Sequence, residues 1–380
     1  MKILFFSTYY YPYISGLTVL PQRIFLQLSK KHHIKILTFQ HNRRLSLTDN
    51  IDGTQIIRMP YWFKIFKGFV SPQSILFFLK EIRKTQLVII NIPNVGGLCL
   101  LILAKLMKKK VIGFFHCQLY FKNNILKKFI ALVANLLIFV QFCFIDEVIA
   151  FSEDYVSSVI VGKIFKKKFH YFLPPIDKLA IDNIYLKKIL ARKKDQVYIG
   201  FVGRIAREKG LFKLVQAVKK LSSQYQLQLV FAGPFGDQVA GENTYYEQLL
   251  TLLNKENIAY SFFGELSREQ LGAFYQAIDV LALPSINKTE AFGLVQAEAM
   301  LLGTPVVAGN LPGVRTSINL TGMGVIYSVE DKNGLANAIK TVIDHRTDYT
   351  NPRLIKKSHQ VFINQQAMQT FSKLLLDLYK

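Results

Sequence analysis

Two carboxylates in the C-terminal half of the chain lie beside a segment that we interpret as a binding site for a phosphorylated ligand. Glu290 lies in a polar loop after the apolar run Val280–Leu283, and Glu298 lies in the helical segment that follows. The backbone between them opens that helix, and a helix N-terminus presents unpaired N–H groups to anions. Carboxylates beside a phosphate would accept hydrogen bonds from ribose or sugar hydroxyls. The residues that open the helix are Ala291, Phe292, Gly293 and Leu294.

Two cations follow another predicted strand. Arg204 and Lys209 lie in a loop directly after Tyr198–Val202, between the glycines Gly203 and Gly210. An Arg guanidinium offers a planar fork to phosphate oxygens, and a Lys ammonium offers a compact point charge. Together they would neutralise a diphosphate, although two surface cations in a chain with 48 Lys and Arg residues are the plainer alternative.

Two residues in the N-terminal half extend the candidate site. His116 ends the apolar run Val111–Phe115, where a histidine either caps a strand edge or points into the crevice at the carboxyl ends of parallel strands. Gly16 lies in the loop after the first strand, where the lack of a side chain would let a ligand approach the backbone closely.

Short apolar runs alternate with helical segments along the whole chain. This alternation predicts an α/β fold with doubly wound, mainly parallel sheets. One helix is predicted from the shared face of Leu211, Leu214, Val215, Val218 and Leu221. The predicted strands are Lys2–Phe6, Ile34–Phe39, Gln55–Met59, Leu87–Asn91, Lys110–Phe115, Val148–Phe151, Tyr198–Val202, Gln228–Ala232, Tyr260–Phe263, Val280–Leu283 and Val306–Ala308.

The best linker in the sequence divides these strands into two sets. Pro174-Pro175 and the charged stretch after them interrupt the pattern, which restarts at Tyr198. We therefore expect a domain over residues 1–177, a linker over 178–196 and a second domain over 197–355. Residues 356–380 are expected to form a C-terminal helix that packs back on the first domain.

Composition excludes several classes of protein. The hydrophobic content of 51% predicts a packed core, and GxxxxGK[ST], a GxGxxG after the first strand, GxSxG and Asp-x-Asp are all absent. No His or Cys cluster has metal-ligand spacing, so no metal site is expected. Cys99, Cys117 and Cys143 each lie in an apolar run, which predicts buried free thiols in a reducing compartment. No signal peptide is recognised, and a cytoplasmic protein is expected.

The net charge of +23 and the 30 Phe residues raise the question of a membrane. The run Phe129–Ile145 is just long enough to span a bilayer, but Asn135 and Gln141 interrupt it, so we predict a helix buried inside an α/β domain. Aromatic residues beside lysines, as in Tyr61–Lys67 and Lys163–Lys168, suit the surface of an anionic bilayer. Two further lysine-rich segments are Lys105–Lys110 and Lys122–Lys128. Lysines spread without pattern over solvated faces are the alternative.

Taken in order, these motifs resemble the GT-B glycosyltransferases, and specifically glycosyltransferase family 4. The family's Glu-x7-Glu motif is matched by Glu290 and Glu298, with Gly303-Thr-Pro305 after them. Its Gly-Arg…Glu-Lys-Gly loop is matched by Gly203-Arg204 and Glu208-Lys209-Gly210, its strand-end histidine by His116, and its first glycine loop by Ser15-Gly16. The likeness covers nearly the whole chain and is sharpest over residues 198–330.

The resemblance implies two Rossmann-like domains that face each other across a cleft, and retaining transfer of a hexose-type sugar from a nucleotide-diphosphate sugar without a cofactor or a metal. Arg204 and Lys209 would hold the diphosphate, Glu298 the ribose, and Glu290 with the N–H groups of Ala291–Leu294 the sugar and phosphate. His116 would contact sugar hydroxyls near the reacting carbon. The acceptor would be a glycan or a lipid-linked molecule, in cell-surface polysaccharide or glycolipid synthesis, with the enzyme peripheral on the inner face of the membrane.

Two departures from the family pattern concern the acceptor side and the hinge. Ser15-Gly16 replaces a pair of glycines, and Pro174-Pro-Ile-Asp177 replaces Pro-Asn-Gly-Val-Asp. A sugar-nucleotide epimerase or hydrolase of the same fold is an alternative, although it would show more carboxylates and histidines. A basic polyanion-binding protein is a second alternative, but no nucleic-acid-binding module is recognised and no nucleic-acid partner is expected.

Overall fold

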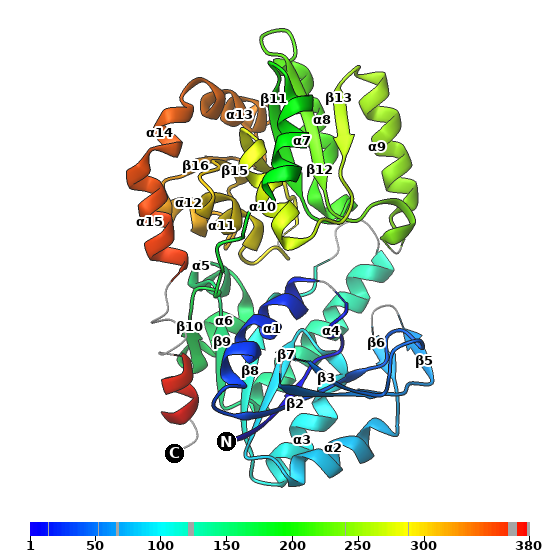
Figure 1. Cartoon of the computed structure of the whole chain (residues 1–380). Coiled ribbons are helices and arrows are strands. Elements are labelled where there is room, and N and C mark those ends of the chain that lie inside the picture. Colours follow the sequence, from blue (N-terminus) through cyan, green and yellow to red (C-terminus); the bar gives the residue numbers. More distant parts are fainter. Residues whose placement is uncertain are drawn as a thin grey trace. The chain divides into compact units, whose positions relative to one another are not determined.

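The computed structural model describes residues 1–13, 15–51, 53–65, 68–120, 125–239, 241–287, 289–363 and 371–377. The chain forms two compact α/β units (Figure 1). Unit 1 comprises Met1–Pro175 and residues 371–377, and unit 2 comprises residues 176–363. Each unit is built around its own parallel sheet.

The sheet of unit 1 places the first strand of the chain in its middle. β1 pairs in parallel with β2 on one side and with β7 on the other, and only the edge strand β3 is antiparallel. Helices and 3₁₀ turns connect the parallel strands. In sheet order the strands are β10 (Phe169–Tyr171), β9 (Glu147–Ala150), β8 (Lys110–Phe115), β7 (Leu87–Ile92), β1 (Lys2–Phe6), β2 (His33–Phe39), β4 (Thr54–Met59) and β3 (Thr48–Ile51); β5 (Phe63–Ile65) and β6 (Gly68–Val70) form a separate hairpin.

The sheet of unit 2 repeats this arrangement with parallel strands throughout. Its first strand, β11, pairs with β12 on one side and with β14 on the other. In sheet order the strands are β13 (Ala259–Phe262), β12 (Leu227–Ala232), β11 (Val197–Val202), β14 (Val280–Leu283), β15 (Val306–Gly309) and β16 (Gly324–Tyr327).

Helices follow the strands in both units (Figure 1). Those of unit 1 are α1 (Gly16–Leu28), α2 (Ser74–Arg83), α3 (Leu98–Leu106), α4 (Ile125–Phe144), α5 (Glu153–Ser157) and α6 (Ile160–Ile164), with η1 (Val95–Gly97) and η2 (Lys166–Lys168). Those of unit 2 are α7 (Asn183–Lys193), α8 (Leu211–Leu221), α9 (Asn243–Lys255), α10 (Arg268–Ala277), α11 (Leu294–Leu301), α12 (Thr316–Thr321), α13 (Gly334–Asp344), α14 (Arg346–Thr350) and α15 (Pro352–Phe362), with η3 (Arg207–Lys209) and η4 (Gly236–Gln238).

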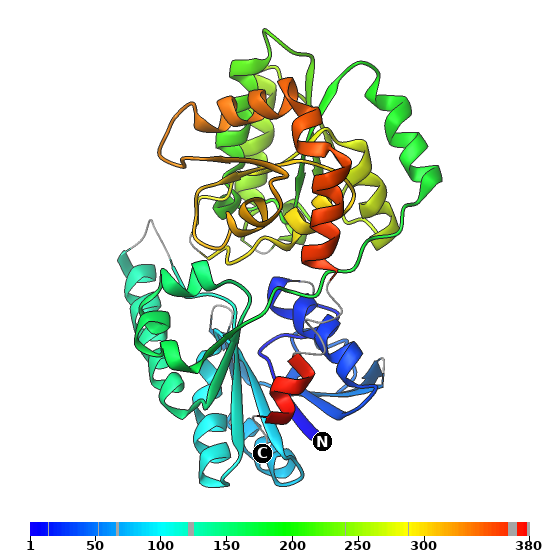
Figure 2. The ribbon, with the colours of Figure 1, turned by 90° about the vertical axis from the view of Figure 1, so that its left-hand side faces the viewer.

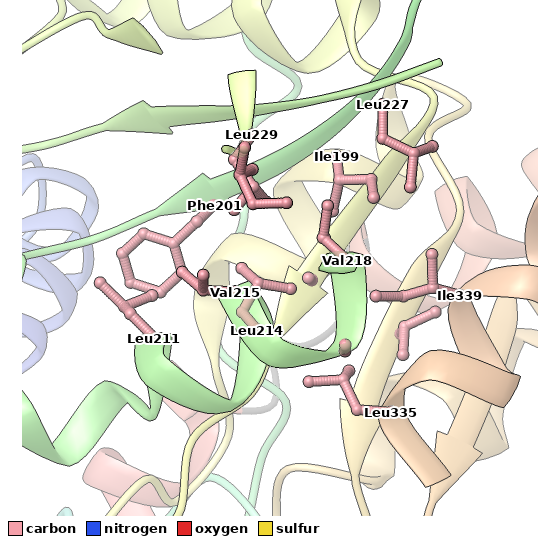
Figure 3. Packing of buried hydrophobic residues seen from close by; sticks show 14 of the residues in the cluster. Ile199, Phe201, Leu211, Leu214, Val215, Val218, Leu227, Leu229, Leu335 and Ile339 are labelled. Atoms are coloured by element: carbon pink, nitrogen blue, oxygen red, sulfur yellow. The ribbon is translucent and has the colours of Figure 1, made fainter. Parts of the chain in front are cut away.

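The core of unit 2 lies between its sheet and the helices α8 and α13 (Figure 3). Phe201 and Leu229 project from β11 and β12 onto the apolar face of α8, and Ile339 of α13 closes the same cluster. The helical periodicity predicted for α8 is confirmed, because all five residues of the predicted face are buried: Leu211, Leu214, Val215, Val218 and Leu221. This packing holds the carboxyl end of β11 in a fixed place.

The C-terminal part of the chain divides between the two units. α15 belongs to unit 2, where the ring of His359 lies 3.0 Å from the carbonyl oxygen of Leu301. The helix over residues 371–377, coloured red in Figures 1 and 2, packs on unit 1, where Phe371 lies against Phe114 and Phe172 with ring centroids 5.9 and 5.8 Å apart. The continuous helix expected over 356–380 is therefore two helices, and residues 364–370 of that prediction lie outside the described residues.

The linker expected over residues 178–196 contains the helix α7. Asp182 caps this helix by accepting a hydrogen bond from the backbone N–H of Tyr185, and Ile189 is its one buried residue. Lys193 near its C-terminus forms an ion pair of 2.6 Å with Asp279. α7 also packs against α10, so this charged segment is a part of unit 2.

Two apolar segments that were predicted to be buried, α3 and α4, are buried on one side only. α4 covers the run that we expected inside the domain, but Phe129, Leu132 and Leu136 are more than 60% exposed. Cys99 and Cys143 are free thiols on exposed positions of helices, and Cys117 is half-buried. Nearly every residue of α3 and α4 is apolar, so the sequence does not show which side of either helix faces the sheet.

Candidate functional site

The order of strands in unit 2 brings the loops after β11 and β14 together. β11 and β14 are neighbours, and the chain leaves them toward opposite edges of the sheet, to β12 and β15. Loops diverge at such a switch point, and ligands of open α/β sheets bind there, outside the carboxyl ends of the strands. The predicted residues Arg204 and Lys209 lie on the first loop, and Glu290 lies on the second.

Two arginines of the loop after β11 contact different partners. The guanidinium of Arg204 donates to Glu208 at 2.9 Å, and its side chain is 37% exposed. Arg207 instead extends toward α9, where its guanidinium lies 5.2 Å from the ring centroid of Tyr245. Arg204 is thus held by a residue of its own loop, whereas Arg207 contributes to packing.

An ion pair joins the two loops. The ammonium of Lys209 lies 2.5 Å from Oε2 of Glu290, and the side chains are 20% and 22% exposed. The pair holds a cation and a carboxylate together at the switch point, half-buried yet within reach of solvent. A diphosphate could exchange with the carboxylate as the partner of Lys209, and Glu290 could accept hydrogen bonds from sugar hydroxyls.

Gly210 lets the two loops approach each other. Its φ of +72° lies in the left-handed region, and a Cβ there would come within 2.1 Å of the carbonyl oxygen of Pro284. Any side chain would therefore push apart the loop that carries Lys209 and the loop that carries Glu290.

The variant Gly210→Ala is expected to lower the free energy of unfolding of the chain by about 1–3 kcal/mol, because it combines left-handed backbone strain with a clash against backbone. Urea unfolding measures this loss. Gly241→Ala is a matched control, since Gly241 also has a positive φ but has no atom within 4 Å of its Cβ position. An equal loss in both variants would contradict the close approach of the two loops.

The buried side-chain amide of Gln296, which was not among the predicted site residues, holds the segment before α11 in place. Gly293 is the N-cap of α11, with φ of 72°. The fully buried side chain of Gln296 donates from Nε2 to the carbonyl oxygens of Phe292 at 3.1 Å and Val314 at 2.9 Å. This fixes the backbone of Ala291–Leu294 at the start of the helix, as an anion site requires. A glutamine inside an apolar helical run was the signal that could have identified it.

Glu298 is a buried residue of α11. The residue is 6% exposed, and the phenol of Tyr275 on α10 donates to its Oε2 at 3.1 Å. Phe292 is also buried and packs edge-on against Phe362, so only its backbone is placed to meet a ligand. Tyr275 carried no sequence signal, because its partner is 23 residues away.

In unit 1, His116 is the end of a chain of buried hydrogen bonds. Its Nε2 lies 2.8 Å from Oδ1 of Asn91, and both residues are less than 10% exposed. The amide nitrogen of Asn91 donates to Ser7 Oγ at 3.0 Å and to the carbonyl oxygen of Leu17 at 2.7 Å. Asn91 lies in β7 and Ser7 directly follows β1, so they lie at the switch point of this sheet.

These contacts fix the tautomer of His116. Because the amide nitrogen of Asn91 already donates twice, its Oδ1 accepts, and Nε2 of His116 carries the hydrogen. Burial lowers the pKa of His116 from 6.5 to about 3, so the ring is neutral at pH 7. Nδ1 then carries a lone pair that can accept a hydrogen bond from a hydroxyl group.

This low pKa has a consequence for stability. The imidazole of His116 binds a proton more tightly in the unfolded chain than in the folded chain. The contribution of neutral His116 to the free energy of unfolding is therefore fully present above pH 6.5 and is lost as the pH falls toward 3. We expect the free energy of unfolding of the wild type to fall by up to about 1.4 kcal/mol more per pH unit than that of His116→Gln between pH 6 and pH 4. Urea titrations of both chains give these slopes, and equal slopes would contradict a depressed pKa.

The predicted site residues divide between the two units. Unit 2 brings Lys209 into contact with Glu290, with Arg204 on the loop of Lys209 and Ala291–Leu294 directly after Glu290, while the side chain of Glu298 contacts α10. His116 and Gly16 belong to unit 1. A Cβ at Gly16 would meet no atom within 4 Å, so the protein itself does not require glycine there, and close approach of a ligand stays a prediction.

Parts of the chain are similar to known proteins. Residues 182–361 match the family model described as glycosyl transferases group 1. A D-inositol 3-phosphate glycosyltransferase of Corynebacterium jeikeium is 38% identical over 152 residues, which are 38% of this chain and 35% of that protein. A Klebsiella pneumoniae protein described as an uncharacterized 41.2 kDa protein in the cps region is 31% identical over 156 residues, 41% of this chain and 38% of that protein. The matches thus span little more than a third of these relatives.

Solved structures are similar over the whole chain. Sucrose-phosphate synthase from Thermosynechococcus elongatus has a TM-score of 0.78 at 16% identity, covering 100% of this chain and 99% of that one. Anabaena HepE in complex with UDP and glucose has a TM-score of 0.77 at 18% identity, covering 99% of each chain. At these identities the likeness shows the fold alone.

Proposed function

We propose that the protein is a retaining glycosyltransferase of family 4, because residues 182–361 match the family model described as glycosyl transferases group 1 and the chain has the GT-B fold. It moves a hexose-type sugar from a nucleotide-diphosphate sugar to a glycan or a lipid-linked acceptor, in the synthesis of a cell-surface polysaccharide or glycolipid. Relatives in this fold are described with such ligands, since HepE has been solved in complex with UDP-glucose.

The ion pair between Lys209 and Glu290 is the observation that carries this proposal. It holds the ammonium of Lys209 against the carboxylate of Glu290 at the switch point of unit 2, and Arg204 lies on the same loop as Lys209. A nucleotide sugar needs both functions within a few ångströms, because its diphosphate is joined directly to the sugar. A simple phosphate-binding site would have no need of Glu290.

Each residue then has a role in breaking the bond between the sugar and the diphosphate. Arg204 and Lys209 stabilise the negative charge that grows on the departing phosphate, with the N–H groups of Ala291–Leu294. Glu290 orients the sugar through its hydroxyls, and Glu298 binds the ribose. The neutral ring of His116 accepts a hydrogen bond from a sugar hydroxyl at Nδ1. Transfer needs no metal, because Arg204 and Lys209 supply the positive charge that a metal would otherwise supply.

A panel of UDP-, GDP- and ADP-sugars tests the proposal. A donor at 100 times its dissociation constant stabilises the protein by about 2.7 kcal/mol, which raises Tm by several degrees. We expect stabilisation by one nucleotide class, and slow release of a sugar whose anomeric configuration, read by NMR, is that of the donor. No stabilisation by any member of the panel would contradict the proposal. Rapid hydrolysis that no acceptor competes with would favour the sugar-nucleotide hydrolase.

A further inference from the structure

The outward face of α4 exposes a row of large apolar side chains. Ile125, Phe129, Leu132 and Leu136 are 87%, 62%, 66% and 61% exposed. Their spacing of four, three and four residues places them on one side of the helix, and we call them the α4 stripe. Val133 beside them is 42% exposed, and Cys143 continues the row as an exposed position two turns further. Single exposed apolar residues are ordinary, but a contiguous row of this kind marks an interaction surface.

A second exposed segment lies directly beside α4. Phe165, between α6 and η2, packs against Phe139 and Phe142 of α4 with ring centroids 5.2 and 5.4 Å apart. The helix α6 that leads to it exposes Ile160 by 66% and Ile164 by 58%. The surface around the α4 stripe is therefore extended by two further aliphatic side chains.

The charged residues of α4, α6 and η2 are all lysines. Lys163, Lys166 and Lys167 are exposed on α6 and η2, and Lys128 is exposed on α4. The sequence contains no Asp or Glu from residue 82 to 145 or from 155 to 168. A partner of this surface must accept both apolar side chains and a one-sided set of cations.

We propose that the α4 stripe, with α6 and η2, is a docking surface for an anionic lipid bilayer. A bilayer offers acyl chains beneath a layer of negative head groups, which matches apolar side chains flanked by lysines. In the described residues no helix is both long and apolar enough to cross a membrane, so α4 would lie in the plane of the interface. A second copy of the chain fits less well, because a two-fold contact of this surface would bring its lysines against each other.

Sedimentation of the full chain with vesicles tests the proposal. We expect binding to vesicles of equal parts phosphatidylglycerol and phosphatidylcholine at low salt, and weaker binding to phosphatidylcholine alone or at 0.5 M salt. The double variant Phe129→Asp with Leu132→Asp should bind at least tenfold more weakly. Lys163→Gln with Lys167→Gln should lower binding by about fivefold for each lysine.

A matched control variant introduces two aspartates on another helix, α7. Ile184 and Leu190 of α7 are 72% and 46% exposed, and Ile184→Asp with Leu190→Asp should bind vesicles as the wild type does. All variants change exposed residues, so their Tm should stay within a few degrees of the wild type, and stabilisation by a nucleotide sugar should be unchanged. A failure of the donor assignment would thus leave the vesicle result intact.

Three results would overturn the proposal. The wild type could fail to bind anionic vesicles, or the stripe variant could bind them as tightly as the wild type. Light scattering could also show that the wild type is a dimer and the stripe variant a monomer, with equal vesicle binding, and then the occupant of this surface is a second copy of the chain.

Discussion

Replacing Arg204 by Ala is expected to lower kcat for sugar transfer by about 10²–10³-fold, while the fold stays intact. In the proposed reaction its guanidinium faces the charge that develops on the departing diphosphate, and the loss appears mainly in kcat because that charge is largest in the transition state. The cost to stability is small, since the side chain is 37% exposed and its ion pair with Glu208 is a surface pair. Initial rates over a range of donor concentrations separate kcat from KM.

Arg207→Ala is the matched control for this experiment. Arg207 lies in the same loop and carries the same charge, but its guanidinium lies over the ring of Tyr245 on α9. We expect its kcat to stay within a few-fold of the wild type. Equal losses in the two variants would show that the loop contributes only its general positive charge, and an active Arg204→Ala would remove the donor assignment.

The strands and the best helix of unit 2 could be predicted because their signals are local. The run Val280–Leu283 is apolar throughout and ends at a proline, and α8 repeats its apolar residues with a helical period. β16 was missed because three of its four residues are only half-buried and it begins with Gly324. α7 was read as a linker because its single buried residue, Ile189, gives no periodic pattern.

The candidate site could be predicted only as a set of residue types. The partners Lys209 and Glu290 are 81 residues apart, and they meet because β14 pairs with β11, an order of strands that no local pattern encodes. The same reason explains why Asn91 and Gln296 were missed, since their importance comes from partners on other elements. Which side of a nearly uniformly apolar helix such as α4 is buried likewise depends on the other elements that pack against it.

Replacing Glu298 by Gln tests the proposal that this residue binds the ribose of the donor. The carboxylate is buried against Tyr275, so it has a structural contact as well as its proposed role with the ribose. Gln keeps the shape and one acceptor oxygen but removes the charge, and a hydrogen bond to a charged group contributes about 1.5–3 kcal/mol. We therefore expect the dissociation constant of the donor to rise about 10–100-fold, with a smaller change in kcat.

Tyr275→Phe separates the two roles of this carboxylate. It removes the hydrogen bond to Oε2 while leaving the charge of Glu298 in place, so it should lower the free energy of unfolding by about 1 kcal/mol and change donor affinity little. Isothermal titration with the nucleotide sugar and urea unfolding of both variants give the comparison. If Glu298→Gln instead loses stability and keeps its donor affinity, Glu298 supports the packing of α11 on α10, and the ribose must be bound by other groups.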